Sequence, residues 1–258
     1  YNNIGRNMMI ANMASRTSCL FFILLIMLFF SRPAQAVRPF VTDDARVVGE
    51  AQAQIETSVR WDKERLQHLN LFALGPTERL ELTAGFIDGF PLEDDVARVF
   101  AIAGPLMQAK YLLLDTIPNG RPGLAIAGGG SPPMGSGSFK PETWREFAYM
   151  AMTASFFDND RVLLHWNVGF TTDNYSTKAT WGIGTQFRIV GGLNGVAEIF
   201  QNDPYGGDTG GAYQAGFRYA FSDYVQVDMT GGTGFFGKRD TTAYYGMGVR
   251  FVTEKLWK

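Results

Sequence analysis

The chain has 258 residues, of which 46% are hydrophobic, and its formal net charge is -2, so a strongly basic nucleic-acid-binding surface is excluded. Glycine occupies 30 positions and aromatic residues make up 14% of the chain, a combination that favours closely packed strands joined by tight turns. The one continuous apolar run, residues 19–30, is shorter than the roughly 20 residues that a membrane-spanning helix needs. A helical membrane protein is therefore excluded as well.

The first 36 residues have the pattern of a secretory signal peptide. Arg6 and Arg16 precede the apolar run, and Pro33-Ala34-Gln35-Ala36 supplies a small-x-small cleavage site after it. A buried core helix is the alternative. Cleavage after Ala36 would remove the one cysteine, Cys19, and three arginines but no acidic residue, leaving 20 basic and 25 acidic side chains. We therefore expect an exported protein that uses no disulfide bonds.

From Ala51 onward, polar and apolar residues alternate with a period of two, which is typical of strands with two different faces. In the first segment, for example, Gln54, Glu56, Ser58 and Arg60 share one face, and the residues between them are mostly apolar. The pattern predicts twelve strands, near residues 51–61, 67–74, 80–87, 106–114, 123–131, 147–157, 162–170, 179–190, 195–202, 211–220, 225–233 and 241–251.

The connections between these segments alternate between short and long. Tight turns rich in Gly, Pro, Asn and Asp are predicted at residues 75–79, 158–161, 191–194 and 221–224. Longer connections are predicted at residues 88–105, 132–146, 171–178, 203–210 and 234–240. Short turns at one end, long loops at the other and an even strand count predict a transmembrane antiparallel up-and-down β-barrel of about 12 strands.

The predicted organisation has three parts. Residues 1–36 form the signal peptide, residues 37–50 form an N-terminal periplasmic or plug segment, and residues 51–258 form the outer-membrane β-barrel. Because a charge in the middle of a bilayer is costly, the apolar face should meet lipid and the polar face should line the lumen. Aromatic residues toward the strand ends of the apolar face would form two interfacial girdles. A soluble barrel with the apolar face inside, as in lipocalins, is the alternative.

Charged residues of the polar face form opposite-sign pairs around the tight turns. Opposite charges on directly apposed residues stabilise neighbouring strands. We therefore expect a ring of ion pairs in the half of the lumen nearer the short turns, although separate solvation of each charge in a wet lumen is also possible. The predicted pairs are Arg188 with Glu198, Arg218 with Asp228, Arg250 with Glu56, and Glu81 with Lys110; Arg60 and His165 complete the predicted lumen-lining or solute-binding residues.

The two histidines are the candidates for catalysis and for metal binding. Both His68 and His165 are predicted to point inward, whereas an outer-membrane lipid hydrolase needs a histidine, a hydroxyl nucleophile and a polar partner on its lipid-facing surface. With two histidines and no cysteine after cleavage, a structural zinc site is excluded. We therefore expect no enzyme, no catalytic residues, no metal and no cofactor.

Several segments of the chain resemble one family of outer-membrane proteins. The start of the predicted mature chain, residues 37–49 and 54–60, and the later residues 74–82, 109–115 and 121–126 are similar to the transport family named for the MetA pathway of phenol degradation. The resemblance implies a barrel in the outer membrane of a Gram-negative cell that admits small organic solutes, aromatic ones among them. It implies a transport role and no reaction.

These observations predict a porin-like channel for passive or facilitated uptake of small organic solutes. Twelve strands leave more interior space than eight and less than the sixteen to eighteen of open porins, so the channel should be narrow and partly obstructed. Its expected partners are outer-membrane lipid, the barrel-assembly machinery and the solute, with no nucleic acid. A lipid-modifying enzyme of the outer membrane and a closed structural barrel are the alternatives.

Overall fold

The structure, a computed structural model, describes residues 40–93, 98–173, 176–205, 208–237 and 242–257. The predicted signal peptide lies outside the described residues. In this part of the chain, two short 3-10 helices, η1 (Gly137–Phe139) and η2 (Asp158–Asp160), accompany thirteen strands: β1 (Ala53–Asp62), β2 (Arg65–Thr77), β3 (Leu80–Pro91), β4 (Ala101–Leu114), β5 (Gly123–Ser131), β6 (Gly135–Ser136), β7 (Arg145–Phe156), β8 (Val162–Asp173), β9 (Ser176–Val190), β10 (Leu193–Asp203), β11 (Asp208–Ala220), β12 (Val225–Gly237) and β13 (Ala243–Val252).

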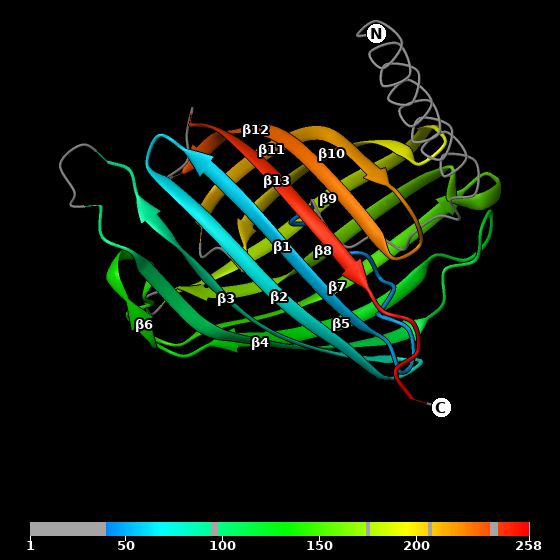
Figure 1. The fold of residues 1–258 in the computed structure, drawn as a ribbon, viewed down its shortest axis with the longest axis horizontal. Helices are drawn as coiled ribbons and strands as arrows, with labels where there is room; N and C mark the ends of the chain where they lie inside the picture. Colours follow the sequence, from blue (N-terminus) through cyan, green and yellow to red (C-terminus); the bar gives the residue numbers. More distant parts are fainter. Residues whose placement is uncertain (1–39, 94–97, 174–175, 206–207, 238–241, 258) are drawn as a thin grey trace, which may run out of the picture.

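Twelve of these strands close into one antiparallel barrel. Each long strand pairs with its neighbours in the chain, and β1 also pairs with β13 through a continuous register from Gln54 opposite Val252 to Asp62 opposite Tyr244. Figure 1 shows β1 and β13 side by side at this closure. The two-residue strand β6 pairs only with β4, at the rim. Closure pairs the first strand with the last, so the barrel has no open edge.

The twelve predicted strands are confirmed, but several extend further than the sequence pattern suggested. Strand β4 begins at Ala101. Strand β8 extends to Asp173 and β9 begins at Ser176, and these two residues are still paired with each other. The predicted long connections 171–178 and 203–210 are therefore wrong in extent. Polar β-formers such as Thr171 and Thr177 continue the ladder beyond the apolar part of each strand, and the alternation of hydrophobicity does not record that extension.

The two walls of the barrel differ in chemistry. The outer wall carries large apolar side chains that remain exposed on the isolated chain, among them Ile55, Phe72, Phe187, Phe217 and Phe251. The inner wall carries the buried polar and charged side chains, including Gln54, Glu56, Lys110, Arg218 and Arg250. This is the arrangement expected of a barrel whose outer surface meets hydrocarbon. Among the described residues, no helix has the length and apolar character needed to cross a bilayer.

Residues 40–50, which precede β1, lie against the inner wall; we call them the luminal segment. Phe40, Thr42, Asp43, Asp44 and Ala45 are each at most 4% exposed. They are buried because the segment contacts β3, β4, β7 and β10, strands from different parts of the wall. We call the end of the barrel at which β1 begins and β13 ends the turn end, and the opposite end the loop end.

Candidate functional site in the lumen

Polar and charged side chains of the inner wall hold the start of the luminal segment. The Glu198 carboxylate accepts hydrogen bonds from the backbone N–H groups of Val41 at 2.8 Å and Thr42 at 2.9 Å. Lys110 Nζ lies 2.9 Å from Asp43 Oδ2, and both side chains are almost fully buried. Because buried charges are costly without partners, these contacts fix the segment firmly in this position.

The middle of the segment is held by a second group of contacts. The Thr153 hydroxyl donates to Asp44 Oδ1 at 2.9 Å and accepts from the Ala45 N–H at 2.9 Å. The Arg46 guanidinium bonds both Asp44 and Asp160, the latter in the turn between β7 and β8. Burial alone raises the pKa of Asp44, but the charge of Arg46 and the neighbouring His165 outweigh it and hold the pKa of that carboxyl well below its usual value. Asp44 is therefore ionised at neutral pH.

A chain of hydrogen bonds links the luminal segment to the loop between β10 and β11. Tyr149 Oη donates to Asp43 Oδ2 at 2.8 Å and lies 2.9 Å from Tyr205 Oη. Tyr205 follows the end of β10, yet it is only 7% exposed, packs against the ring of Phe147, and donates to Gln108 Oε1 at 2.6 Å. A loop residue and the luminal segment thus meet inside the barrel and together obstruct the lumen.

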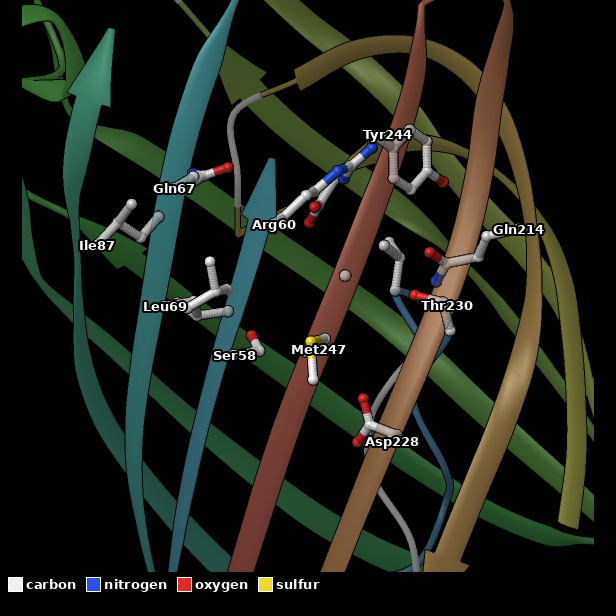
Figure 2. Close-up of a pocket in the computed structure, with 14 residues that line it drawn as sticks. Ser58, Arg60, Gln67, Leu69, Ile87, Gln214, Asp228, Thr230, Tyr244 and Met247 are labelled. Atoms are coloured by element: carbon white, nitrogen blue, oxygen red, sulfur yellow. The ribbon is translucent and has the colours of Figure 1, made fainter. Parts of the chain in front are cut away.

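A small cavity remains on the loop side of this obstruction, between the inner wall and Val41. Figure 2 shows its lining side chains, which come from strands on both sides of the barrel closure. The cavity has a volume of about 70 Å³, which is enough for a few water molecules and too small for an organic solute. The luminal segment therefore leaves little free space at this level of the lumen.

Arg60 is the most unusual group in this cavity. Its guanidinium carbon lies 3.6 Å from the ring centroid of Tyr244, a close cation–π arrangement that is visible in Figure 2. Its Nε and Nη2 atoms are buried and have no hydrogen-bond partner among the described residues. Buried donors in this state favour an acceptor ligand, and an arginine offers a carboxylate two parallel hydrogen bonds. The cavity therefore contains a guanidinium cation, an aromatic ring and two N–H donors that a ligand could bind.

The structure places all ten residues of the predicted lumen set on the inner wall. Three of the four predicted pairs are directly opposite in register: Glu56 with Arg250, Glu81 with Lys110, and Arg218 with Asp228. The fourth is wrong, because Arg188 lies opposite Asn194 and Glu198 lies opposite Gly184. The β9–β10 turn is only two residues long, and an irregularity at residues 193–194 shifts the register, so the assumed turn centre was incorrect.

The ion-pair ring is only part of what the inner charges do. Arg250 Nε lies 3.9 Å from Glu56 Oε1 and bonds Gln54 at 2.7 Å. Glu81, by contrast, accepts from the Val48 N–H at 2.8 Å. Together with Lys110 and Glu198, this side chain holds the luminal segment. Cross-strand pairing and anchoring of the segment therefore share the same residues.

The two histidines differ in position. His165 points inward, as predicted, is 1% exposed, and lies 2.9 Å from the Thr153 hydroxyl. His68 does not: it is opposite Val59 in register, on the outer wall, where its side chain is 36% exposed. The inward prediction for His68 is wrong because both faces of β2 near its start carry polar and apolar residues, so the local alternation is ambiguous.

Sequence reasoning missed the residues that close the lumen. The sequence pattern predicted no luminal role for Asp43, Tyr149, Tyr205 or Tyr244. Tyr149 and Tyr244 do alternate with outward-facing residues of their strands, which is a usable signal of an inward position. Tyr205 lies outside any strand, and nothing in the sequence shows that it folds into the lumen.

Comparison with known proteins identifies a family. Residues 103–251, more than half of the chain, match the family described as "Uncharacterised conserved protein UCP029691", and the chain belongs to that family. No curated protein matches the sequence.

Solved structures define the fold class. The chain is similar to the COG4313 outer membrane channel from Pseudomonas putida F1, with a TM-score of 0.58 and 10% identity over 85% of this chain and 100% of that one. It is also similar to the KdgM porin, with a TM-score of 0.54 and 10% identity over 78% of this chain and 99% of that one. A KdgM porin in complex with disordered oligogalacturonate gives a TM-score of 0.55 at 11% identity, over 78% and 99% of the two chains. The shared feature is the barrel fold of outer-membrane channels.

Proposed function

We propose that this protein is an outer-membrane channel for small organic solutes, whose lumen is closed in the described state by the luminal segment. The observation that carries the proposal is a closed twelve-strand barrel with an apolar outer wall and a charged inner wall. Such a wall suits hydrocarbon outside and water inside. The similarity to an outer membrane channel and a porin supports the same class of protein.

This proposal includes the cellular location and the partners expected from the sequence. Export would follow from the signal peptide at residues 1–36, and insertion would require the barrel-assembly machinery. Aromatic side chains near both ends of the outer wall, such as Trp61 stacked on Tyr245 at the loop end and Phe251 at the turn end, suit two bilayer interfaces.

We propose organic anions that carry an aromatic ring as the solute class. The Nε and Nη2 donors of Arg60 would bind a carboxylate side-on. The Arg60 guanidinium already stacks on the ring of Tyr244, so a second flat aromatic group would suit the same place. The resemblance to the family named for phenol degradation supports an aromatic solute. The described cavity is too small to hold such a molecule, so its binding requires that the luminal segment move.

Passive passage then requires two steps. The luminal segment leaves its contacts with the inner wall, and the solute follows the charged lumen down its concentration gradient, selected by bore and charge. No covalent step and no energy source are needed.

Planar-bilayer recording with the purified protein tests the proposal. We expect discrete conductance steps, block of the current by added benzoate, and weaker block by benzyl alcohol, which has the ring without the carboxylate. Arg60→Gln should weaken the benzoate block by about tenfold, because a charge-assisted bidentate contact is lost. Arg188→Gln, on the inner wall away from the cavity, is the matched control. A protein that never conducts, with or without the luminal segment, would contradict the proposal.

A further inference from the structure

Four polar side chains form a cluster on the outer wall, where apolar residues predominate. Thr57 on β1, His68 and Asn70 on β2, and Asp88 on β3 all point away from the lumen, because they alternate with buried inward neighbours. In register, Thr57 lies opposite Asn70, and His68 lies opposite Asp88. The cluster thus spans three adjacent strands.

Within this cluster, three side chains have the geometry of a nucleophile, a base and an orienting carboxylate. Thr57 Oγ1 lies 2.6 Å from His68 Nε2, and His68 Nδ1 lies 3.2 Å from Asp88 Oδ1. The Thr57 hydroxyl also has a longer contact of 3.1 Å to Asn70 Oδ1. The shorter contact, to the imidazole, is the one through which a hydroxyl nucleophile is activated.

One of the two tautomers of His68 makes it a base toward Thr57. A proton on Nδ1, donated to Asp88, leaves Nε2 with a lone pair that accepts the Thr57 proton. Asn70 Nδ2 lies 3.4 Å from the other oxygen of Asp88 and helps to orient that carboxylate. Threonine, like serine, carries the hydroxyl that this kind of catalysis needs.

An apolar hollow of about 480 Å³ lies directly beside Thr57 and His68. Its other outward-facing walls are side chains of β11, β12 and β13, namely Phe217, Tyr219, Val227, Met229, Met247 and Val249. These residues belong to the surface that meets lipid in the proposed function. A groove with apolar walls and a hydroxyl–imidazole pair at its edge suits an acyl chain whose ester group reaches the pair.

We propose that Thr57, His68 and Asp88 form a catalytic site for the hydrolysis of acyl esters of membrane lipids, with the hollow as the acyl-chain site. Thr57 Oγ forms a bond to the ester carbonyl carbon, and its proton passes to His68 Nε2. The bond between that carbon and the alcohol oxygen then breaks, and the leaving alkoxide takes the proton from His68. Water, activated in the same way, cleaves the Thr57 ester, releases the fatty acid and restores the hydroxyl. Asp88 is a positioning residue.

The location of the site gives both reactants access to it. His68 is three residues from the start of β2 and Asp88 is three residues from the end of β3, so the base lies roughly 10 Å from the loop end of these strands. Lipid reaches the outer wall laterally, and water reaches this depth from the interface. This inference rests on the membrane placement of the proposed function, but not on conduction through the lumen.

The experiment uses the folded full-length protein in detergent micelles. An alkyl fluorophosphonate should label it covalently at Thr57, located by mass spectrometry of peptides. Mixed micelles of a diacyl phosphatidylethanolamine should yield free fatty acid with turnover. Thr57→Val and His68→Gln should each reduce both signals by at least about 100-fold. Asp88→Asn should slow the release and change its pH profile, which a purely structural role would not do.

A matched control is available on the same wall. Thr185 also faces outward, but its hydroxyl donates to the backbone carbonyl of Leu163, and it has no histidine partner among the described residues. Thr185→Val should leave labelling and fatty-acid release unchanged. If Thr57→Val fails to fold, Thr57→Ser should fold and retain the labelling that Thr57→Ala lacks. Equal labelling of the Thr57→Val variant and the unchanged protein, or no fatty-acid release from the unchanged protein, would overturn the proposal. Conductance, measured on the same samples, reports on the channel separately.

Discussion

The two ends of the lumen differ in the partners of their buried charged side chains. Toward the turn end, ionised groups of the wall contact the luminal segment directly: Lys110 binds Asp43, Glu81 binds the Val48 N–H, and Asp160 binds Arg46. Toward the loop end, two nitrogens of Arg60 have no such partner among the described residues. The turn end is thus complete without a ligand, whereas the loop end has a cation available for one.

This difference teaches how such a barrel is closed. The contacts at the turn end are hydrogen bonds and ion pairs to a segment that leads directly into the start of β1. Water can replace each of these bonds when the segment leaves, because the groups involved are polar. The segment also buries apolar side chains, among them Phe40, Ala45, Val47 and Val48. Its release therefore exposes this apolar surface as well as the polar contacts.

The strongest test of this comparison is removal of the luminal segment. Deleting residues 40–48 should raise the single-channel conductance by at least about tenfold, because the lumen loses the chain that fills its turn end. Planar-bilayer recording measures the effect. A synthetic peptide of residues 40–48 added back should restore the block, and a peptide of reversed sequence should not. Unchanged conductance after the deletion would show that the wall itself closes the lumen.

A smaller effect is expected when one anchor of the segment is broken. Lys110→Met leaves Asp43 and Glu81 without the buried cation between them, which costs about 3–5 kcal/mol and favours release of the segment. Limited proteolysis within residues 40–50 should become faster, and the channel should open more often. Adding Asp43→Asn to that variant should recover part of the loss. No coupling between the two substitutions would mean that the ion pair does not hold the segment.

A finer test compares a correct ion pair with an incorrect one. Exchanging the charges of Arg218 and Asp228, which lie directly opposite each other, should show a coupling energy of about 1–3 kcal/mol in a double-mutant cycle. The same cycle on Arg188 and Glu198, which are not opposite, should show almost none. Urea unfolding in micelles measures both. Equal coupling in the two cycles would show that overall charge matters more than register.

These results show why the sequence predicts the walls better than the lumen. The face of a residue follows from a local period of two, and a charged side chain on the lipid-facing wall is costly, so the inward positions of Glu56 and Arg250 were predicted correctly. The residue opposite a given position in a hairpin depends on where the turn is centred. A register shift between Leu193 and Asn194 places Asn194, and not Glu198, opposite Arg188. Thr57, His68 and Asp88 are polar although they point outward, where the pattern predicts apolar residues. Their contacts with one another across three strands satisfy these polar groups.

The contents of the lumen were predictable in outline only. Residues 37–50 were expected to form a periplasmic or plug segment, and composition does not distinguish the two. Asp43 is held by Lys110 and Tyr149, from β4 and β7, which lie far from it in the sequence. Long-range contacts of this kind leave no periodic signal in the chain. The unused donors of Arg60 are equally a property of the assembled lumen.

The smallest expected effect concerns acid. Since the pKa of Asp44 lies well below its usual value of 3.8 in the folded state, the stabilisation that it provides is fully present above that usual value and is lost only as pH falls through the lowered one. Lowering the pH from 7 to 5 should therefore leave proteolysis of the luminal segment unchanged as far as Asp44 is concerned. The measurement is best made with His165→Gln, because that imidazole is a titratable wall group beside Asp44. Asp44→Asn should speed proteolysis equally at both pH values. If the His165→Gln variant and the same variant with Asp44→Asn were proteolysed at different rates at pH 7 but at the same rate at pH 5, the Arg46 guanidinium would not keep Asp44 ionised.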